Sequence, residues 1–297
     1  MGKGYSSEEI REKLISVLGD STTGMSGIEI SEKIGVSRIT MTKYLKVFAA
    51  EGLLRQKNIG NVTLWFLEPD QESFTFPDDY FKITSKFLEN LTKGTEQQVY
   101  SLIRNCIHSG ASINLLILEV IIPAINPINK LYDEGKIGSS ELSLLKNTIS
   151  KSLQIINQLQ VVPNPQKNIV VIAADSESTL ISEAASSAFH SGGWNVSHLG
   201  DMSHAINVLF DLDFQKLISK IWKQKPGILI VVVFSQTSEG VIFFVDSITP
   251  IKEKSGKRMK LTLCTKISKK SKIKADLISE NLHDILQWSD TTFQNFK

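Results

Sequence analysis

Lys167–Gly200, KNIVVIAADSESTLISEAASSAFHSGGWNVSHLG, is the stretch of the sequence that decides the fold. Its residues 168–174 form a short apolar run rich in β-branched side chains, which predicts a strand. Residues 178–191 have helical periodicity and end at two glycines, and residues 194–199 predict a second strand. A strand, a helix and a strand within about thirty residues indicate a βαβ unit, whose strands pair in parallel through a right-handed crossover.

The chain beyond this unit continues the alternation of strands and helices. Residues 227–234 are a continuous apolar run, as expected for a central strand of a parallel sheet. We expect helices at 203–223, 239–251 and 282–296, and further strands at 259–264 and 275–278. The sequence therefore predicts an α/β domain over residues 167–297, with a flavodoxin-like doubly wound parallel sheet.

The candidate ligand residues lie in the loops after the strands, because open parallel sheets bind ligands at the carboxyl ends of their strands. They are Asp175, Glu177 and Ser178 after the first strand, His204 after the second, and Ser235 and Thr237 after the third. Loop carboxylates also commonly cap the following helix, and His204 also suits an ordinary surface position. A small-molecule ligand is thus expected, with these structural roles as the alternative.

Composition limits the classes of function. A length of 297 residues suggests two or three domains, and a net charge of +2 requires that any nucleic-acid binding be local. Cys106, Cys264 and the five histidines form no metal or disulfide pattern, so we expect no metal site. Glu119 and Pro123 interrupt the most apolar stretch, 115–125, which favours a buried helix. With no signal-peptide pattern, we expect a cytoplasmic protein without membrane contact.

Catalytic patterns are also missing from the sequence. No nucleophile stands at motif spacing from a histidine base, and no glycine-rich loop joins a strand to a helix in the way that cradles phosphates. The glycines at 192–193 follow a helix, which is the wrong context. We therefore expect no catalytic residues and no enzymatic activity.

Residues 1–68 form a separate unit with a different pattern. They predict a helix, a short helix at 28–34, a turn at Gly35-Val36, a helix from Ser37 to about Ala50, and two strands joined by a turn. The run ISEKIGVSRITMTKYLKVFAAEGLL resembles winged helix-turn-helix transcription regulators, an α+β fold whose third helix enters the major groove of double-stranded DNA.

The residues expected at the DNA lie on this helix and on the following strand. Basic residues outnumber acidic ones from Ser37 to Lys57, where phosphates would lie. A winged helix that serves only protein contacts is the alternative. The expected DNA-binding residues are Ser37, Arg38, Ile39, Thr40, Thr42, Lys43, Lys46, Arg55 and Lys57.

Residues 78–160, which lie between two polar linkers, are predicted to be helical. Four expected helices, at 78–93, 95–108, 112–133 and 139–160, have apolar stripes and short connections, which predicts an all-α four-helix bundle. A plain dimerisation bundle is one interpretation. The segment ASINLLILEVIIPAINPINKLYDEGKIGSSELSLL resembles the helical cap of cobalamin-binding regulators and corrinoid proteins, where the bundle directly precedes a flavodoxin-like cobalamin domain.

The motifs that hold cobalamin in that family are changed in this chain. The family's cobalt-ligating histidine follows the first strand, where this sequence has Glu177 or Ser178, and neither replaces an imidazole on cobalt. A glycine pair after the fourth strand is replaced by Cys264-Thr265-Lys266. Tyr132 stands for the cap's tryptophan, as a ligand contact or a core residue, and Leu142-Ser143 for its Glu-His pair.

These observations together indicate a DNA-binding transcription regulator that acts as a homodimer, with a cobalamin-binding-type module that senses a ligand or mediates oligomerisation. Cobalamin is the cofactor that the resemblance implies, and we expect it to be absent. The alternatives are a cobalamin-dependent regulator, a corrinoid carrier for methyl transfer, and a scaffold without a ligand. The basic stretch 252–274 is expected to be a solvated face, and a second DNA-contacting surface or an anion site are the alternatives.

Overall fold

The chain folds into two compact units, which are described separately. The first comprises residues 1–76 and 100–110, and the second comprises residues 77–99 and 111–297. The computed structural model describes residues 5–296 except 20, 22, 61, 68–73, 94, 205–210, 223–225 and 267–272. The predicted division into three domains, at 1–68, 78–160 and 167–297, stays a prediction.

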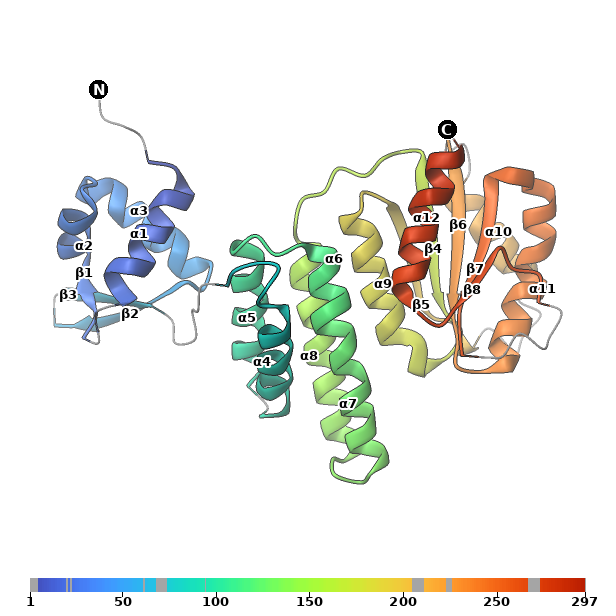
Figure 1. Cartoon of the computed structure of the whole chain (residues 1–297), viewed down its shortest axis with the longest axis horizontal. Helices are drawn as coiled ribbons and strands as arrows, with labels where there is room; N and C mark the ends of the chain where they lie inside the picture. The colour runs from blue at the N-terminus through green and yellow to red at the C-terminus, as the bar shows by residue number, and fades with distance from the viewer. Residues whose placement is uncertain are drawn as a thin grey trace. The chain divides into compact units, whose positions relative to one another are not determined.

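Residues 5–67 of the N-terminal unit, as far as the structure describes them, form three helices and a small antiparallel sheet (Figure 1). Its elements are α1 (Ser7–Gly19), β1 (Met25–Ser26), α2 (Gly27–Ile34), α3 (Arg38–Ala50), β2 (Leu54–Ile59) and β3 (Val62–Leu67), with the strands in the order β1-β3-β2. Met41, Leu45 and Phe48 form one apolar stripe of α3 and are buried in the core of this unit. The two-residue strand β1 was not predicted from the sequence, and it pairs with β3 through Met25 and Trp65.

Local capping residues fix the ends of α2 and α3. Ser26 and Glu29 form a capping box at the start of α2, and Gly35 ends it in the left-handed conformation at φ 79°. Ser37 caps α3, because its Oγ accepts the Thr40 backbone N–H at 3.2 Å. The turn between the two helices is therefore set by residues that need these backbone conformations, and it determines where α3 begins.

Between the small antiparallel sheet and the parallel sheet, the chain between residues 80 and 157 is mainly helical. The helices of this region are α4 (Tyr80–Thr92), α5 (Glu96–His108), a continuous helical segment made of α6 (Ile113–Leu115), η1 (Leu116–Ile121) and α7 (Ile122–Asp133), and α8 (Ser139–Asn157). Their bounds lie close to the four expected helices. Residues 100–110, which include most of α5, group with the N-terminal unit instead, so the four-helix bundle as such stays a prediction.

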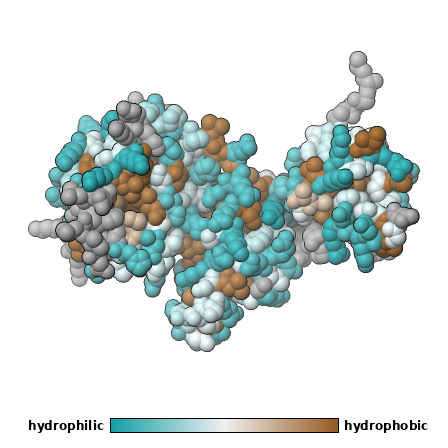
Figure 2. Space-filling model, turned by 180° about the vertical axis from the view of Figure 1, so that it is seen from behind, coloured by the Kyte–Doolittle hydropathy of each residue, from teal (hydrophilic) through white to brown (hydrophobic). Residues whose placement is uncertain are grey.

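The segment 113–133, which we call the roof helix, is long and apolar enough to cross a membrane by length and composition. Its apolar side chains are used inside the protein, because Leu116, Ile117, Val120 and Ile121 are buried. On the face that Figure 2 shows, apolar residues occur in small groups between hydrophilic ones. The roof helix is only partly buried, since 39% of its most apolar stretch lies inside the protein, and the expectation of a buried helix is met on the face that carries these four residues.

The C-terminal part is a five-stranded parallel sheet between helices, as the βαβ stretch predicts (Figure 1). Its strands are β4 (Lys167–Ala173), β5 (Asn195–Asp201), β6 (Ile228–Phe234), β7 (Met259–Cys264) and β8 (Leu277–Ser279), in the order β5-β4-β6-β7-β8. The helices are α9 (Thr179–Ser191), α10 (Asp211–Trp222), α11 (Ser238–Ser255) and α12 (Leu282–Phe296), with short turns η2 (Ser176–Ser178) and η4 (Gly256–Arg258). This order is that of flavodoxin-like folds.

Each face of the sheet has its own apolar core. Val170, Leu229 and Leu261 lie in the core that contains Phe214 of α10 and Phe244 of α11. Ile169, Ile230 and Phe234 lie in the opposite core, which contains Phe189 of α9 and Phe293 of α12. Strands that are buried on both faces are expected to be continuous apolar runs. For this reason β4 and β6 can be recognised as strands in the sequence.

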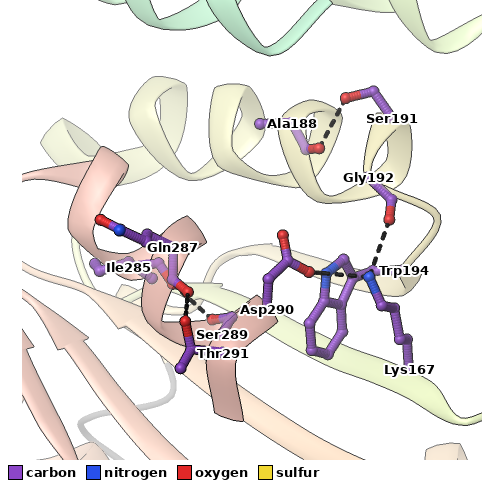
Figure 3. A network of polar contacts seen from close by, with 10 residues as sticks. All are labelled: Lys167, Ala188, Ser191, Gly192, Trp194, Ile285, Gln287, Ser289, Asp290 and Thr291. Atoms are coloured by element: carbon purple, nitrogen blue, oxygen red, sulfur yellow. Dashed lines mark hydrogen bonds and ion pairs between the residues drawn. The ribbon is translucent and has the colours of Figure 1, made fainter. Parts of the chain in front are cut away.

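A polar network fastens α12 to the amino-terminal edge of this sheet (Figure 3). The Lys167 ammonium lies 2.9 Å from the Asp290 carboxylate, and the Trp194 indole N–H donates to the same carboxylate at 3.1 Å. Lys167 also donates to the Gly192 carbonyl at 3.4 Å. Because Lys167 begins β4, this network is at the end of the strand opposite to the edge where ligands bind.

Candidate functional site

A cavity of the second unit lies at the carboxyl edge of the sheet, under the roof helix. Its volume is about 540 Å³, within the range of small-molecule sites. Four segments that follow strands supply its floor and rim, and the roof helix covers it. We call it the sheet-edge pocket. The residues that line it are Leu118, Glu119, Ile122, Asn126, Ser178, Ile181, Phe234, Gln236, Cys264, Thr265, Lys266, Glu280, Asn281, Leu282 and His283.

The roof helix departs from regular α-helical geometry where it passes over the pocket. Residues 116–121 form a π-helical turn, and Pro123 lies two residues after its end. Proline has no N–H to donate to the carbonyl of Glu119, four residues earlier. The Thr84 hydroxyl of α4 lies 2.6 Å from that carbonyl oxygen and 2.8 Å from the carbonyl oxygen of Tyr80, and it shares its one proton between them. The hydrogen bond from α4 therefore holds the roof helix where Leu118, Glu119 and Ile122 line the pocket.

Asp175 joins the loops after β4 and β6. Its carboxylate accepts the Ser178 backbone N–H at 2.9 Å, the Gln236 backbone N–H at 2.7 Å and the Ser235 hydroxyl at 3.0 Å. Thr237 caps α11 through its Oγ1, which accepts the Gly240 N–H at 3.2 Å. A side chain at Gly240 would place its Cβ 2.8 Å from the Ser235 Oγ, so glycine is required for this close approach.

Two buried polar groups in the pocket, the Ser178 hydroxyl and the Cys264 thiol, lie outside this hydrogen-bond network. The Ser178 Oγ is buried and has no hydrogen-bond partner within the described structure. Burial, together with the nearby Glu280 carboxylate, raises the pKa of the Cys264 thiol to about 12. The thiol is therefore protonated at neutral pH. A buried hydroxyl without a partner is uncommon in proteins and indicates an unfilled interaction at this position.

The structure does not bring all seven candidate ligand residues together. Ser178 lines the sheet-edge pocket. Asp175, Ser235 and Thr237 are outside its lining, and hydrogen bonds connect the loop of Asp175 with the loop of Ser235 and Thr237. Glu177, His204 and Tyr132 are exposed, and they do not line this pocket. Their roles as ligand contacts stay predictions.

Several pocket residues were missed by reasoning from sequence. Lys266, Glu280 and His283 follow β7 and β8, so the rule that selected the loop after β4 could have found them. Glu119 and Asn126 come from the roof helix, and no local pattern connects them to the sheet. Their position depends on the packing of a helix that precedes the sheet in the chain.

The pocket does not fit a corrinoid held as the resemblance implies. The loop after β4 supplies no imidazole, and His283, the histidine among the described lining residues, comes from α12. At the end of β7, Cys264 and Thr265 are 6% and 3% exposed, so their side chains fill the place of the family's glycine pair. Phe234 and Leu282 are buried beside them. The floor is therefore closed to a nucleotide tail.

The second candidate site is the exposed face of α3 in the N-terminal unit. Arg38, Lys43 and Lys46 are exposed, and no ion pair to them occurs in the described part of the chain. Ile39, beside Arg38, is 76% exposed. A groove of about 350 Å³ runs between this helix and the β2-β3 hairpin, lined in part by Arg38, Thr42 and Lys46.

The remaining predicted DNA residues surround this face. Ser37 and Thr40 bond to each other at the start of α3, at 2.8 Å, and the Thr42 hydroxyl donates to the Arg38 carbonyl at 2.8 Å. On β2, Arg55 lies over the Phe66 ring at 5.3 Å, and Lys57 is exposed. All nine predicted residues therefore lie on α3, its cap or β2, and their contact with DNA stays a prediction.

Comparison with known proteins identifies the fold of the sheet and the helices before it. No protein-family model matches the sequence, and no curated protein matches it significantly. Among solved structures, the monomethylamine corrinoid protein of Methanosarcina barkeri has 13% identity and a TM-score of 0.53, over 70% of this chain and 97% of that one. The methanol:cobalamin methyltransferase complex of the same organism has 14% identity and a TM-score of 0.36, over 75% and 86%, and no argument rests on it. The chain thus contains a module with the fold of corrinoid-binding proteins.

Proposed function

We propose that this protein is a DNA-binding transcription regulator whose corrinoid-type module senses a small molecule. The observation that carries the proposal is the α3 face, where three exposed cations, Arg38, Lys43 and Lys46, have no anionic partner in the described structure. Unpaired cations gathered on one helix face suit a row of phosphates, whose neutralisation releases condensed counterions. The N-terminal unit would act as a winged helix.

The arrangement of the unit supports this use of α3. The helix begins directly after a tight turn from α2, and the hairpin lies beside it, which is the order of elements in helix-turn-helix proteins with a wing. The exposed residues of β2, including Arg55 and Lys57, would contact the backbone of the duplex. Arg38, Thr42 and Lys43 would face the major groove.

We further propose that the regulator is a homodimer. A single winged helix offers few base contacts, and two copies on a two-fold symmetric operator multiply specificity. Light scattering of the purified chain is expected to give twice its mass of 33.1 kDa. A monomer at micromolar concentration, with and without DNA, would contradict this part of the proposal.

The test of the proposed function is DNA binding by the full chain. Fragments that cover the promoters of the source genome would be incubated with the protein, and the retained fragments sequenced. We expect selective binding that weakens by a factor on the order of 10³ between about 50 and 200 mM salt. If no fragment is retained at low salt, the N-terminal unit is not a DNA-binding domain, and its use for protein contacts becomes the better interpretation.

A second function, a corrinoid carrier for methyl transfer, is supported by the fold of the module. It requires an axial ligand and room for the corrinoid, which the loop after β4 and the residues after β7 do not offer. Methyl-, adenosyl- and hydroxocobalamin would be added to the protein, and visible spectra recorded after gel filtration. We expect no retained colour. Stoichiometric uptake with a shifted band would favour a cobalamin-dependent regulator if DNA binding is also present, and a carrier if it is absent.

A further inference from the structure

The sheet-edge pocket combines an uncharged floor with a charged rim. Phe234 and Leu282 form the apolar part of the floor, and Ser178 and Thr265 add hydroxyl groups. The thiol of Cys264 carries no charge at neutral pH, since its pKa is raised to about 12. A charged group placed on this floor would lose its hydration without a counter-ion, which is unfavourable. The part of a ligand that reaches the floor must therefore be neutral and largely apolar.

The rim carries both signs of charge. Glu119 of the roof helix and Glu280 after β8 supply carboxylates, and Lys266 after β7 supplies an ammonium group. All three are exposed, and within the described chain none of them has an ion-pair partner. A ligand head with one positive and one negative group would complement this rim, whereas a simple cation or anion would meet a repelling charge.

From these two observations we infer that the sheet-edge pocket binds a small zwitterion with an apolar body, the chemistry of the large apolar amino acids. The body would rest on Phe234 and Leu282 under the roof helix. The ammonium group would lie toward Glu119 and Glu280, and the carboxylate toward Lys266. The hydroxyl of Ser178, which lacks a partner, would meet either a polar atom of the ligand or a water carried in with it.

The volume of the pocket agrees with this class of ligand. About 540 Å³ lies within the range of roughly 300–1,000 Å³ that holds drug-sized molecules. A single amino acid with a few waters occupies such a space, while a corrinoid, with its flat ring and tail, needs an opening through the floor. The same residues that close the floor to the tail therefore shape a site for a compact ligand.

The experiment is calorimetry of the full chain with the standard amino acids, tested singly and without DNA. We expect saturable binding of at least one large apolar amino acid. Two analogues of that ligand, one without its carboxylate and one without its ammonium group, should each bind at least tenfold more weakly. Lys266→Gln should weaken binding of the intact ligand about tenfold, which corresponds to about 1.4 kcal/mol, and should leave binding of the analogue without a carboxylate unchanged.

Matched variants separate binding from folding. Lys220→Gln alters an exposed lysine of α10 outside the pocket and should leave binding unchanged, while thermal melting checks that each variant is folded. No saturable binding of any amino acid, binding of either analogue as tight as that of the intact ligand, or uptake of hydroxocobalamin would each overturn the inference. The inference rests on the proposed function only in treating the pocket as the sensor site. Because no DNA is present, its failure leaves the DNA result untouched, and a failure of DNA binding leaves the calorimetry untouched.

Discussion

The charged residues of the α3 face have no partner within the described chain, whereas the charged residue of the loop after β4, Asp175, is hydrogen-bonded. Arg38, Lys43 and Lys46 are exposed and unpaired within the described chain, so the fold gains nothing from them. Asp175 accepts three hydrogen bonds that join the loops after β4 and β6. Both were candidate functional residues in the sequence. The comparison teaches that the partners of a charge, and not its residue type, separate a binding surface from a structural connection.

The strongest test of the comparison is charge reversal on α3. Lys43→Glu combined with Lys46→Glu should weaken binding to a selected promoter fragment on the order of 100-fold, because two phosphate contacts become repulsive. The slope of log affinity against log salt should decrease by about 2 in magnitude. Urea unfolding should give a free energy within about 0.5 kcal/mol of the wild type, since no partner is lost.

The control is Lys220→Glu, which reverses an exposed lysine on α10 in the other unit. It has the same change of charge per residue and should leave both the affinity and the salt slope close to the wild type. An equal loss of affinity in this variant would mean that net charge, and not the α3 face, determines binding.

Asp175→Ala should have the opposite signature. Two backbone N–H groups and one hydroxyl lose a charged acceptor, and the free energy of unfolding should fall by about 2–3 kcal/mol. Glu177→Ala, two residues further along the same loop, removes an exposed carboxylate and should change it by less than about 0.5 kcal/mol. Urea denaturation followed by circular dichroism measures both. Similar values for the two variants would show that the three bonds to Asp175 contribute no net stability.

Much of the fold is predictable from the sequence because its strands are buried on both faces. β4 and β6 are continuous apolar runs, and the turn at Gly192-Gly193 separates α9 from β5. The strand β1 was missed because two residues carry no periodicity, and its pairing with β3 depends on contacts distant in sequence. The π-helical turn before Pro123 was missed for a related reason, since its free carbonyl is satisfied by Thr84 of another helix.

The candidate site is less predictable than the fold. The carboxyl-edge rule locates the pocket, but it selects Asp175 and Ser235, which satisfy each other, as readily as Ser178, which has no partner. Whether a polar residue is satisfied depends on distances between loops that are about sixty residues apart in the chain. Such distances leave no trace in the spacing of residue types, so sequence patterns could not separate the two roles.

A weaker and pH-dependent effect is expected at Asp276, which precedes β8. Its ammonium partners are Lys252 at 2.6 Å and Lys260 at 3.5 Å, and it accepts the Leu261 N–H at 2.8 Å. Burial raises the pKa of Asp276, but the hydrogen bonds and the two lysines outweigh burial, and the pKa is lowered from its ordinary 3.8. The ionised form therefore stabilises the fold above pH 3.8, and this stability is lost as the pH falls through the lowered pKa.

Asp276→Asn should accordingly reduce the free energy of unfolding at neutral pH, and the difference from the wild type should shrink in acid. Urea denaturation at a series of pH values from neutral to acidic measures this difference. A difference that stays constant, or grows as the pH falls, would mean that the ion pairs with Lys252 and Lys260 are not its cause.

The smallest effect is expected at Glu183 of α9. In its number of partners it is intermediate between the unpaired cations of α3 and the hydrogen-bonded Asp175. Its carboxylate is partly buried and accepts one hydrogen bond, from the Ser150 hydroxyl at 2.8 Å. Burial raises the pKa of Glu183 above its ordinary 4.5, and the bond from Ser150 only partly offsets this. The folded state therefore binds the proton more tightly than the unfolded state, and stability declines as the pH rises from about 4.5 through the raised pKa.

Glu183→Gln removes the charge and keeps an oxygen that can accept the Ser150 hydrogen bond. The variant should be slightly more stable than the wild type at neutral pH, and the gain should vanish in acid, where Glu183 is itself protonated. Ser150→Ala tests the remaining bond, because a hydrogen bond to a charged acceptor is stronger than one to a neutral acceptor. It should therefore destabilise the wild type more than the Glu183→Gln variant. If Glu183→Gln lowers stability at neutral pH, the carboxylate has a favourable interaction beyond Ser150, and Glu183 belongs with Asp175 as a structural connection.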